Sequence, residues 1–99
     1  MSHANDASDA APRELPLLVG ARPGEPEVLL LIGAPVQDVV HVRRWTSDDW
    51  SASPQSLPED AAQLLRWVEA QAARGRSLNQ SLYAVRLWLR DPDASAGTR

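Results

Sequence analysis

Three residue types are missing from this 99-residue sequence: cysteine, lysine and phenylalanine. The absence of cysteine excludes disulfides, thiolate nucleophiles and cysteine metal sites, so the fold depends on packing alone. All ten basic residues are arginine, a usage typical of high-GC genes, and we infer a bacterial source. Without phenylalanine, the aromatic side chains are four tryptophans and one tyrosine.

Long apolar runs and targeting signals are also lacking. The longest aliphatic run, residues 28–32, is too short to span a bilayer. Residues 1–13 are polar and contain no apolar core of a secretory signal, so we expect a cytoplasmic protein and no membrane contact. The formal net charge of −3 argues against general binding to nucleic acid or to an anionic membrane, because both require clustered positive charge.

The length of the chain predicts one domain. Residues 1–13 and 92–99 are polar and rich in alanine, without a periodic apolar face, and we expect both to be disordered tails. Residues 14–91 contain the apolar segments, so we expect them to form a single α+β domain.

Apolar segments in the first half of the chain indicate β-strands. We place these strands at about residues 15–20, 27–32 and 36–46. Between the first two, Pro23 and Gly24 fit the central positions of a type II turn, which predicts a hairpin. Residues 50–53 are a candidate fourth strand, whose length Pro54 limits.

The second half of the chain has helical periodicity. Ser56 fits an N-cap, and Glu59, three residues later, completes a capping box. Apolar residues then recur at three- and four-residue spacing as far as Gly75, a typical residue after a helix end. We therefore predict a helix over about residues 57–74.

Residues 78–90 fit two structures. As a helix, the segment is capped by Ser77 and ended by Pro92. As a strand over 81–90, its alternate apolar residues would share one face. We favour the helix, because Val85 is the only β-branched residue in the segment and leucine, alanine and arginine favour helices. The expected fold is a three- to four-stranded antiparallel sheet with two helices on one face, and the alternative order is β-β-β-α-β.

Residues that could perform catalysis are scarce. Of the two histidines, His3 falls in the expected tail and leaves His41 as the single candidate for acid–base chemistry. The sequence has no glycine-flanked serine motif, no phosphate-binding glycine cluster and no histidine pair at metal-ligand spacing. We therefore expect neither an enzyme nor a cofactor or metal site.

The segment of residues 28–32 is apolar at every position, as is typical of a strand buried on both faces. Two helices cover only one face of a sheet, so the other face should carry an apolar patch beside Val39, His41 and Trp45. A second copy of the chain, related by a two-fold axis, is one candidate to cover this patch. A terminal tail or the segment around Trp50 is the other.

Tryptophan and arginine concentrate binding energy at interfaces. The interaction residues that we predict are His41, Arg43, Arg44, Trp45 and Trp50. Our leading hypothesis is a small non-catalytic protein-interaction or regulatory module, homodimeric through the sheet face. The first alternative is a binder of single-stranded nucleic acid that uses Arg43, Arg44, Trp45 and Trp50, which the net acidity disfavours. A small-molecule-binding accessory domain is the second alternative.

Overall fold

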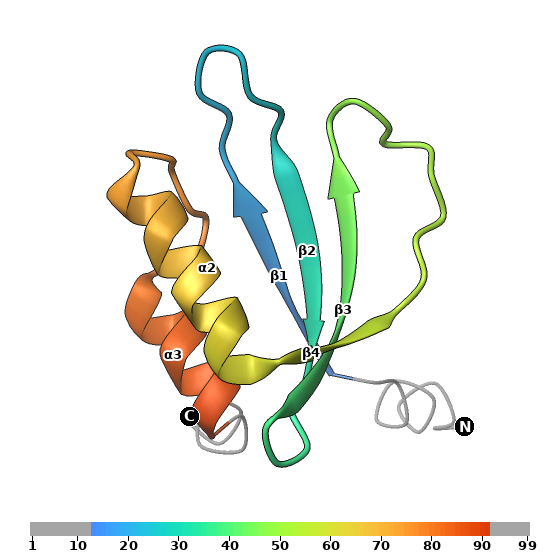
Figure 1. The fold of residues 1–99 in the computed structure, drawn as a ribbon, viewed down its shortest axis with the longest axis vertical. Coiled ribbons are helices and arrows are strands. Elements are labelled where there is room, and N and C mark those ends of the chain that lie inside the picture. Colours follow the sequence, from blue (N-terminus) through green and yellow to red (C-terminus); the bar gives the residue numbers. More distant parts are fainter. Residues whose placement is uncertain (1–12, 92–99) are drawn as a thin grey trace, which may run out of the picture.

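The fold is known from a computed structural model, which describes residues 13–91 of the chain (Figure 1). The strands are β1 (Glu14–Val19), β2 (Val28–Gly33), β3 (Val39–Thr46) and β4 (Leu57–Asp60), and the helices are α2 (Ala61–Ala73) and α3 (Leu82–Arg90). All neighbouring strands are antiparallel, and the sheet order is β1-β2-β3-β4. Both helices lie against one face of the sheet, which confirms the predicted α+β fold. Apart from Arg13, the two expected tails lie outside the described residues.

The first hairpin agrees with the prediction to within one residue at each boundary. At its turn, Gly24 has a φ of +82°, and the N–H of Glu25 donates to the carbonyl of Arg22 at 2.8 Å. Glycine adopts this conformation without a steric penalty, because it has no Cβ. The turn sets the register in which Leu18 lies opposite Leu29.

Strand β3 starts later than the predicted residue 36. Val36 and Val39 exchange two backbone hydrogen bonds of 2.9 and 3.1 Å, and they enclose a turn that consists of Gln37 and Asp38. Gln37 has a φ of +59°, a region that side chains with a Cβ rarely adopt. The chain therefore reverses where the sequence predicted a continuous strand.

The fourth strand was predicted at the wrong place. Residues 50–53 are not a strand, whereas Leu57–Asp60, which the sequence predicts as the start of a helix, pairs with Val39–Val42 of β3. Pro58 fits this edge strand because it lies opposite His41, where its missing N–H faces away from β3. The strand pairing therefore takes precedence over the capping box.

Both helices begin four residues later than the predicted 57 and 78. The N-cap of α2 is Asp60, whose side chain accepts from the N–H of Gln63 at 3.0 Å, and the N-cap of α3 is Ser81, whose hydroxyl accepts from Ala84 at 3.0 Å. Aspartate and serine cap equally well, so several candidate starts exist in each segment. The alternative strand at 81–90 is wrong, because these residues form α3.

One hydrophobic core lies between the helices and the sheet. The sheet contributes Leu17, Val19, Val28, Leu30, Ile32, Val40 and Val42, and the helices contribute Ala61, Leu64, Val68, Val85, Trp88 and Leu89. Val40 and Val42 thus face the helices, as their alternation with His41 predicted. The indole Nε1 of Trp88, which is 6% exposed, donates to the carbonyl of Ile32 at 3.1 Å and fixes α3 to the end of β2.

Candidate functional site

The sheet face turned away from the helices, hereafter the outer face, carries a group of apolar side chains. Alternation along β2 places Leu29 and Leu31 there, and the register puts Leu18 and Trp45 on either side of Leu29. All four are partly exposed, and α2 and α3 both pack on the opposite face. The outer face is therefore the apolar patch that the sequence predicted, made of the alternates of the buried β2 residues.

Arg43 and Trp45 meet at this patch. The guanidinium of Arg43 lies 5.6 Å from the centre of the Trp45 ring, a cation–π distance. A second contact joins Arg43 Nη2 to both carboxylate oxygens of Glu14 at 3.0 Å. The charge of Arg43 is therefore paired with Glu14 of β1, at one side of the leucines.

His41 lies further along β3 on the same face, opposite Pro58. Its side chain is exposed, and it has no hydrogen-bond or ion-pair partner within residues 13–91. A general base in a catalytic relay is normally oriented by a second polar group. His41 therefore lies exposed at the rim of the patch, without such an orienting group among residues 13–91.

Arg44 does not belong to the outer face. Its side chain lies on the helix side of the sheet, 5.5 Å from the Trp67 ring centre and 3.4 Å from a carboxylate oxygen of Glu59. The predicted pair of adjacent arginines is thus divided between the two faces of β3, because neighbouring residues of a strand point in opposite directions.

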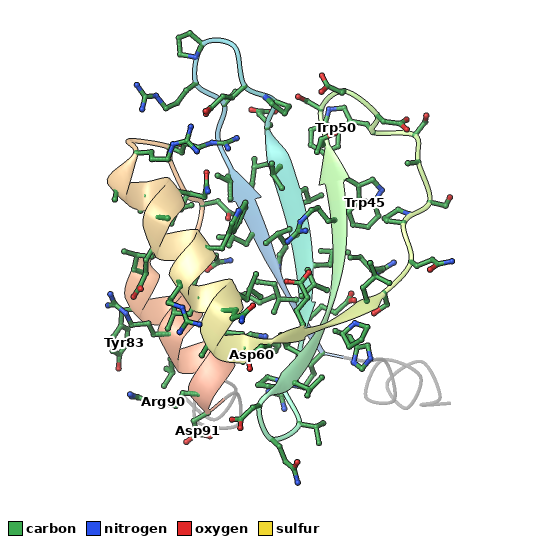
Figure 2. All side chains as sticks on the ribbon, viewed as in Figure 1. Trp45, Trp50, Asp60, Tyr83, Arg90 and Asp91 are labelled. Carbon is green, nitrogen blue, oxygen red and sulfur yellow. The ribbon has the colours of Figure 1, made fainter. Side chains whose placement is uncertain are left out.

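Trp45 and Trp50 have different roles. The Nε1 of Trp45 donates to the carbonyl of Ala52 at 2.9 Å, so this ring is partly covered by the segment of residues 47–56. Trp50 belongs to that segment, is 46% exposed and lies near the end of β3 (Figure 2). Of the predicted residues, the structure therefore places His41, Arg43 and Trp45 on the outer face, whereas the side chain of Arg44 lies on the helix side and Trp50 belongs to the loop after β3.

A cleft of about 370 Å³ adjoins the outer edge of β3. Its strand side includes Val42, Arg44 and Thr46, and its other side includes Asp49, Pro54 and Leu57. Apart from Arg44 and Trp45, none of the residues that line this cleft was predicted to take part in binding. The signal that would have revealed the edge is the pair of prolines, Pro54 and Pro58, which favours a short edge strand after a loop.

No family model, no curated protein and no solved structure matches this chain. Within residues 13–91, no group of three acidic or histidine side chains is arranged to hold a metal ion. Neither α2 nor α3 is long and apolar enough to cross a membrane. The candidate site is therefore defined by its own geometry: an apolar sheet face with Arg43 and His41 at its rim.

Proposed function

We propose that this protein is a small non-catalytic protein-interaction module that associates with a second copy of itself through the outer face. The observation that carries the proposal is the group formed by Leu18, Leu29, Leu31 and Trp45 on the sheet face opposite the helices. Leucine side chains in this position lose contact with water when another apolar surface covers them, which favours association.

The charges on the outer face support a protein partner. In β1, β2 and β3 the fully charged residues on this face are Arg43 and Glu14, and these two are joined at 3.0 Å. Two charges that already neutralise each other lose little hydration free energy when an apolar surface covers them. The same pair offers no free positive charge to a polyanion. Arg44 is likewise paired with Glu59, on the other side of the sheet. These pairs disfavour the nucleic-acid alternative.

A second copy is the occupant that fits this surface best. A two-fold axis near Leu29 and Leu31 would place leucines of one copy on leucines of the other, because an isologous interface uses the same patch twice. Because β2 is flanked by β1 and β3, Leu29 and Leu31 lie in the middle of the outer face and not at its edge. With Arg43 and Glu14 internally paired, no like charges would be forced together.

Sedimentation velocity on the full chain tests this proposal. At about 100 μM we expect a dimer, a range in which even weak specific association is detected. Leu31→Glu should give a folded monomer, with folding checked by circular dichroism. Tyr83→Glu is the matched control, because Tyr83 is 69% exposed on α3 and lies away from the outer face (Figure 2). A monomeric wild type, or a dimer that dissociates with Tyr83→Glu and not with Leu31→Glu, would refute the proposal.

A further inference from the structure

The β1 edge of the sheet is closed by the chain itself. The N–H of Leu18 donates to Oδ1 of Asn79 at 2.7 Å, and its carbonyl accepts from the N–H of Asn79 at 3.2 Å. The N–H of Gly20 donates to the carbonyl of Ser77 at 2.8 Å. The connection between α2 and α3 thus occupies the hydrogen-bonding groups that an edge strand otherwise presents to other chains.

The β3 edge, by contrast, is covered over only half of its length. Strand β4 has four residues, and its register ends with Leu57 opposite Val42. Because the proline at position 58 has no N–H, the pair that it forms with His41 is the non-hydrogen-bonded type, and Val42 and Leu57 are a hydrogen-bonded pair. The next β3 residue whose backbone faces this edge is therefore Arg44.

The N–H and carbonyl of Arg44 have no partner among residues 13–91, because no β4 residue lies opposite them. Both groups face the β3 edge, which adjoins the cleft of about 370 Å³, a volume within the range of ligand-binding pockets. Figure 1 shows the cause, since the chain between β3 and β4 bows away from the β3 edge. The cleft is thus a section of open strand edge enclosed by a loop.

We propose that this cleft binds an extended peptide segment of a partner protein, without acidic side chains, which pairs with Arg44 as an added strand. Backbone hydrogen bonds hold such a peptide to the edge, and side pockets select its alternate side chains. The peptide residue opposite Arg44 would lie on the helix side, beside Val42 and Leu57. Its neighbours would lie on the other side, against the ring of Trp45, and should be apolar.

The preference for a peptide without acidic side chains follows from the charges in the cleft. The guanidinium of Arg44 already has Glu59 as a partner at 3.4 Å. An acidic peptide side chain would compete with Glu59 for Arg44, and it would meet the carboxylate of Asp49 on the other side of the cleft. Affinity should therefore come from the backbone and from apolar contacts.

The competing occupant is the chain's own segment of residues 53–55. If β4 continued in register, Gln55 would face Arg44, and Pro54 would again take a non-hydrogen-bonded position. In the structure this segment is held away from the edge, because the backbone N–H of Asp49 donates to the carbonyl of Thr46 at 3.0 Å and Nε1 of Trp45 donates to the carbonyl of Ala52. Amide hydrogen exchange at Arg44 distinguishes a bound peptide from closure of the loop.

Amide hydrogen exchange on the full, isotope-labelled chain tests the proposal. The probe is a blocked five-residue peptide of alternating valine and threonine. In the free protein the amide of Arg44 should exchange fast and that of Val42 slowly. With the peptide at about ten times its Kd, exchange at Arg44 should slow about tenfold. A free protein in which Arg44 is as protected as Val42 would show that the loop has closed, which overturns the proposal.

Two N-methylated forms of the peptide test the pairing itself. One form is methylated on the valines and the other on the threonines, so each lacks the N–H donors of one strand edge. One form should lose the protection of Arg44 and the other should keep it, because only one edge of the peptide meets β3. Equal behaviour of the two forms would contradict strand addition.

Two substitutions provide the protein variants. Arg44→Pro removes the N–H that faces the cleft and should abolish peptide binding, measured by the tryptophan fluorescence change on titration, with folding checked by circular dichroism. Arg66→Ala, on the exposed side of α2 and outside the cleft, is the control and should bind like wild type. A folded Arg44→Pro variant that binds the peptide as tightly as wild type would overturn the proposal, and the N-methylated peptides decide the question if that variant does not fold. The proposed dimer shares Trp45 with the cleft, whereas the amide of Arg44, which the exchange experiment measures, lies at the β3 edge and outside the dimer contacts.

Discussion

The side chain of Arg76 donates from Nε to the carbonyl of Gly20 at 2.7 Å, although the two residues are 56 positions apart in the sequence. Arg76 is only 8% exposed, and it also donates to Oε1 of Gln71 and to the carbonyl of Pro26. One arginine therefore ties the β1–β2 turn to the end of α2. Buried polar groups of this kind contribute most when every partner is satisfied.

Arg76→Met should lower the free energy of unfolding by about 3 kcal/mol, because two backbone carbonyls and the Gln71 amide oxygen lose their donor. Methionine keeps much of the aliphatic volume, so the loss reports on the hydrogen bonds. Urea unfolding followed by tryptophan fluorescence measures it. Arg66→Met, on the exposed side of α2, is the control and should change the stability by less than about 0.5 kcal/mol. Equal losses in the two variants would contradict a locking role for Arg76.

The observed helix caps lead to a second prediction. Ser81→Ala should cost about 1 kcal/mol, because the hydroxyl of Ser81 accepts from the N–H of Ala84, whereas Ser77→Ala should be nearly neutral. The same contrast should hold between Asp60→Ala and Ser56→Ala in α2. Thermal unfolding of the four variants checks it. A larger loss of stability in Ser77→Ala and Ser56→Ala than in Ser81→Ala and Asp60→Ala would contradict the observed caps and favour helix starts at residues 57 and 78.

These caps show why part of the fold could be predicted and part could not. The apolar runs of β1 and β2 and the position of Gly24 depend on local chemistry, and the hairpin was placed within one residue. The strand β4 forms only because β3 supplies a partner, and no local pattern in Leu57–Asp60 contains that information. Tertiary pairing therefore replaced a favourable local helix start.

A third prediction concerns the tryptophans. Trp88→Phe should lower the free energy of unfolding by about 2 kcal/mol, since it removes the N–H that Ile32 accepts and leaves space in the core. Trp50→Phe alters a ring that is 46% exposed, and the expected change is close to zero. Chemical denaturation monitored by circular dichroism separates the two. If Trp50→Phe proves the more damaging, the assignment of Trp88 to the core is wrong.

The turn at Gln37 gives a fourth prediction with the opposite sign. Gln37→Gly should raise the melting temperature by about 4 °C, because glycine adopts a φ of +59° without strain. Gln37→Ala keeps a Cβ in the same conformation and should give no gain. Differential scanning calorimetry on both variants decides the point. A gain with alanine equal to that with glycine would rule out backbone strain as the cause.

The candidate site was also only partly accessible from the sequence. The apolar outer face followed from the uninterrupted run in β2, and the meeting of Arg43 with Trp45 followed from their spacing on one strand. Alternation along β3 also implies that the side chain of Arg44 faces the helices. The prediction missed this because it grouped Arg44 with Arg43 and the tryptophans by residue type alone. The open edge at Arg44 depends on where β4 ends, which only the register reveals.

The most direct test of the proposed dimer is an isotope-filtered NOE experiment on a mixture of labelled and unlabelled chain at about millimolar concentration. The proposal predicts intermolecular contacts between the methyl groups of Leu29 and Leu31 of one copy and those of the other. It predicts no intermolecular contact from the ring of Tyr83 on α3. The absence of any contact between copies, or contacts that arise from Tyr83 and not from the two leucines, would contradict the claim that the outer face is the interaction surface of this protein.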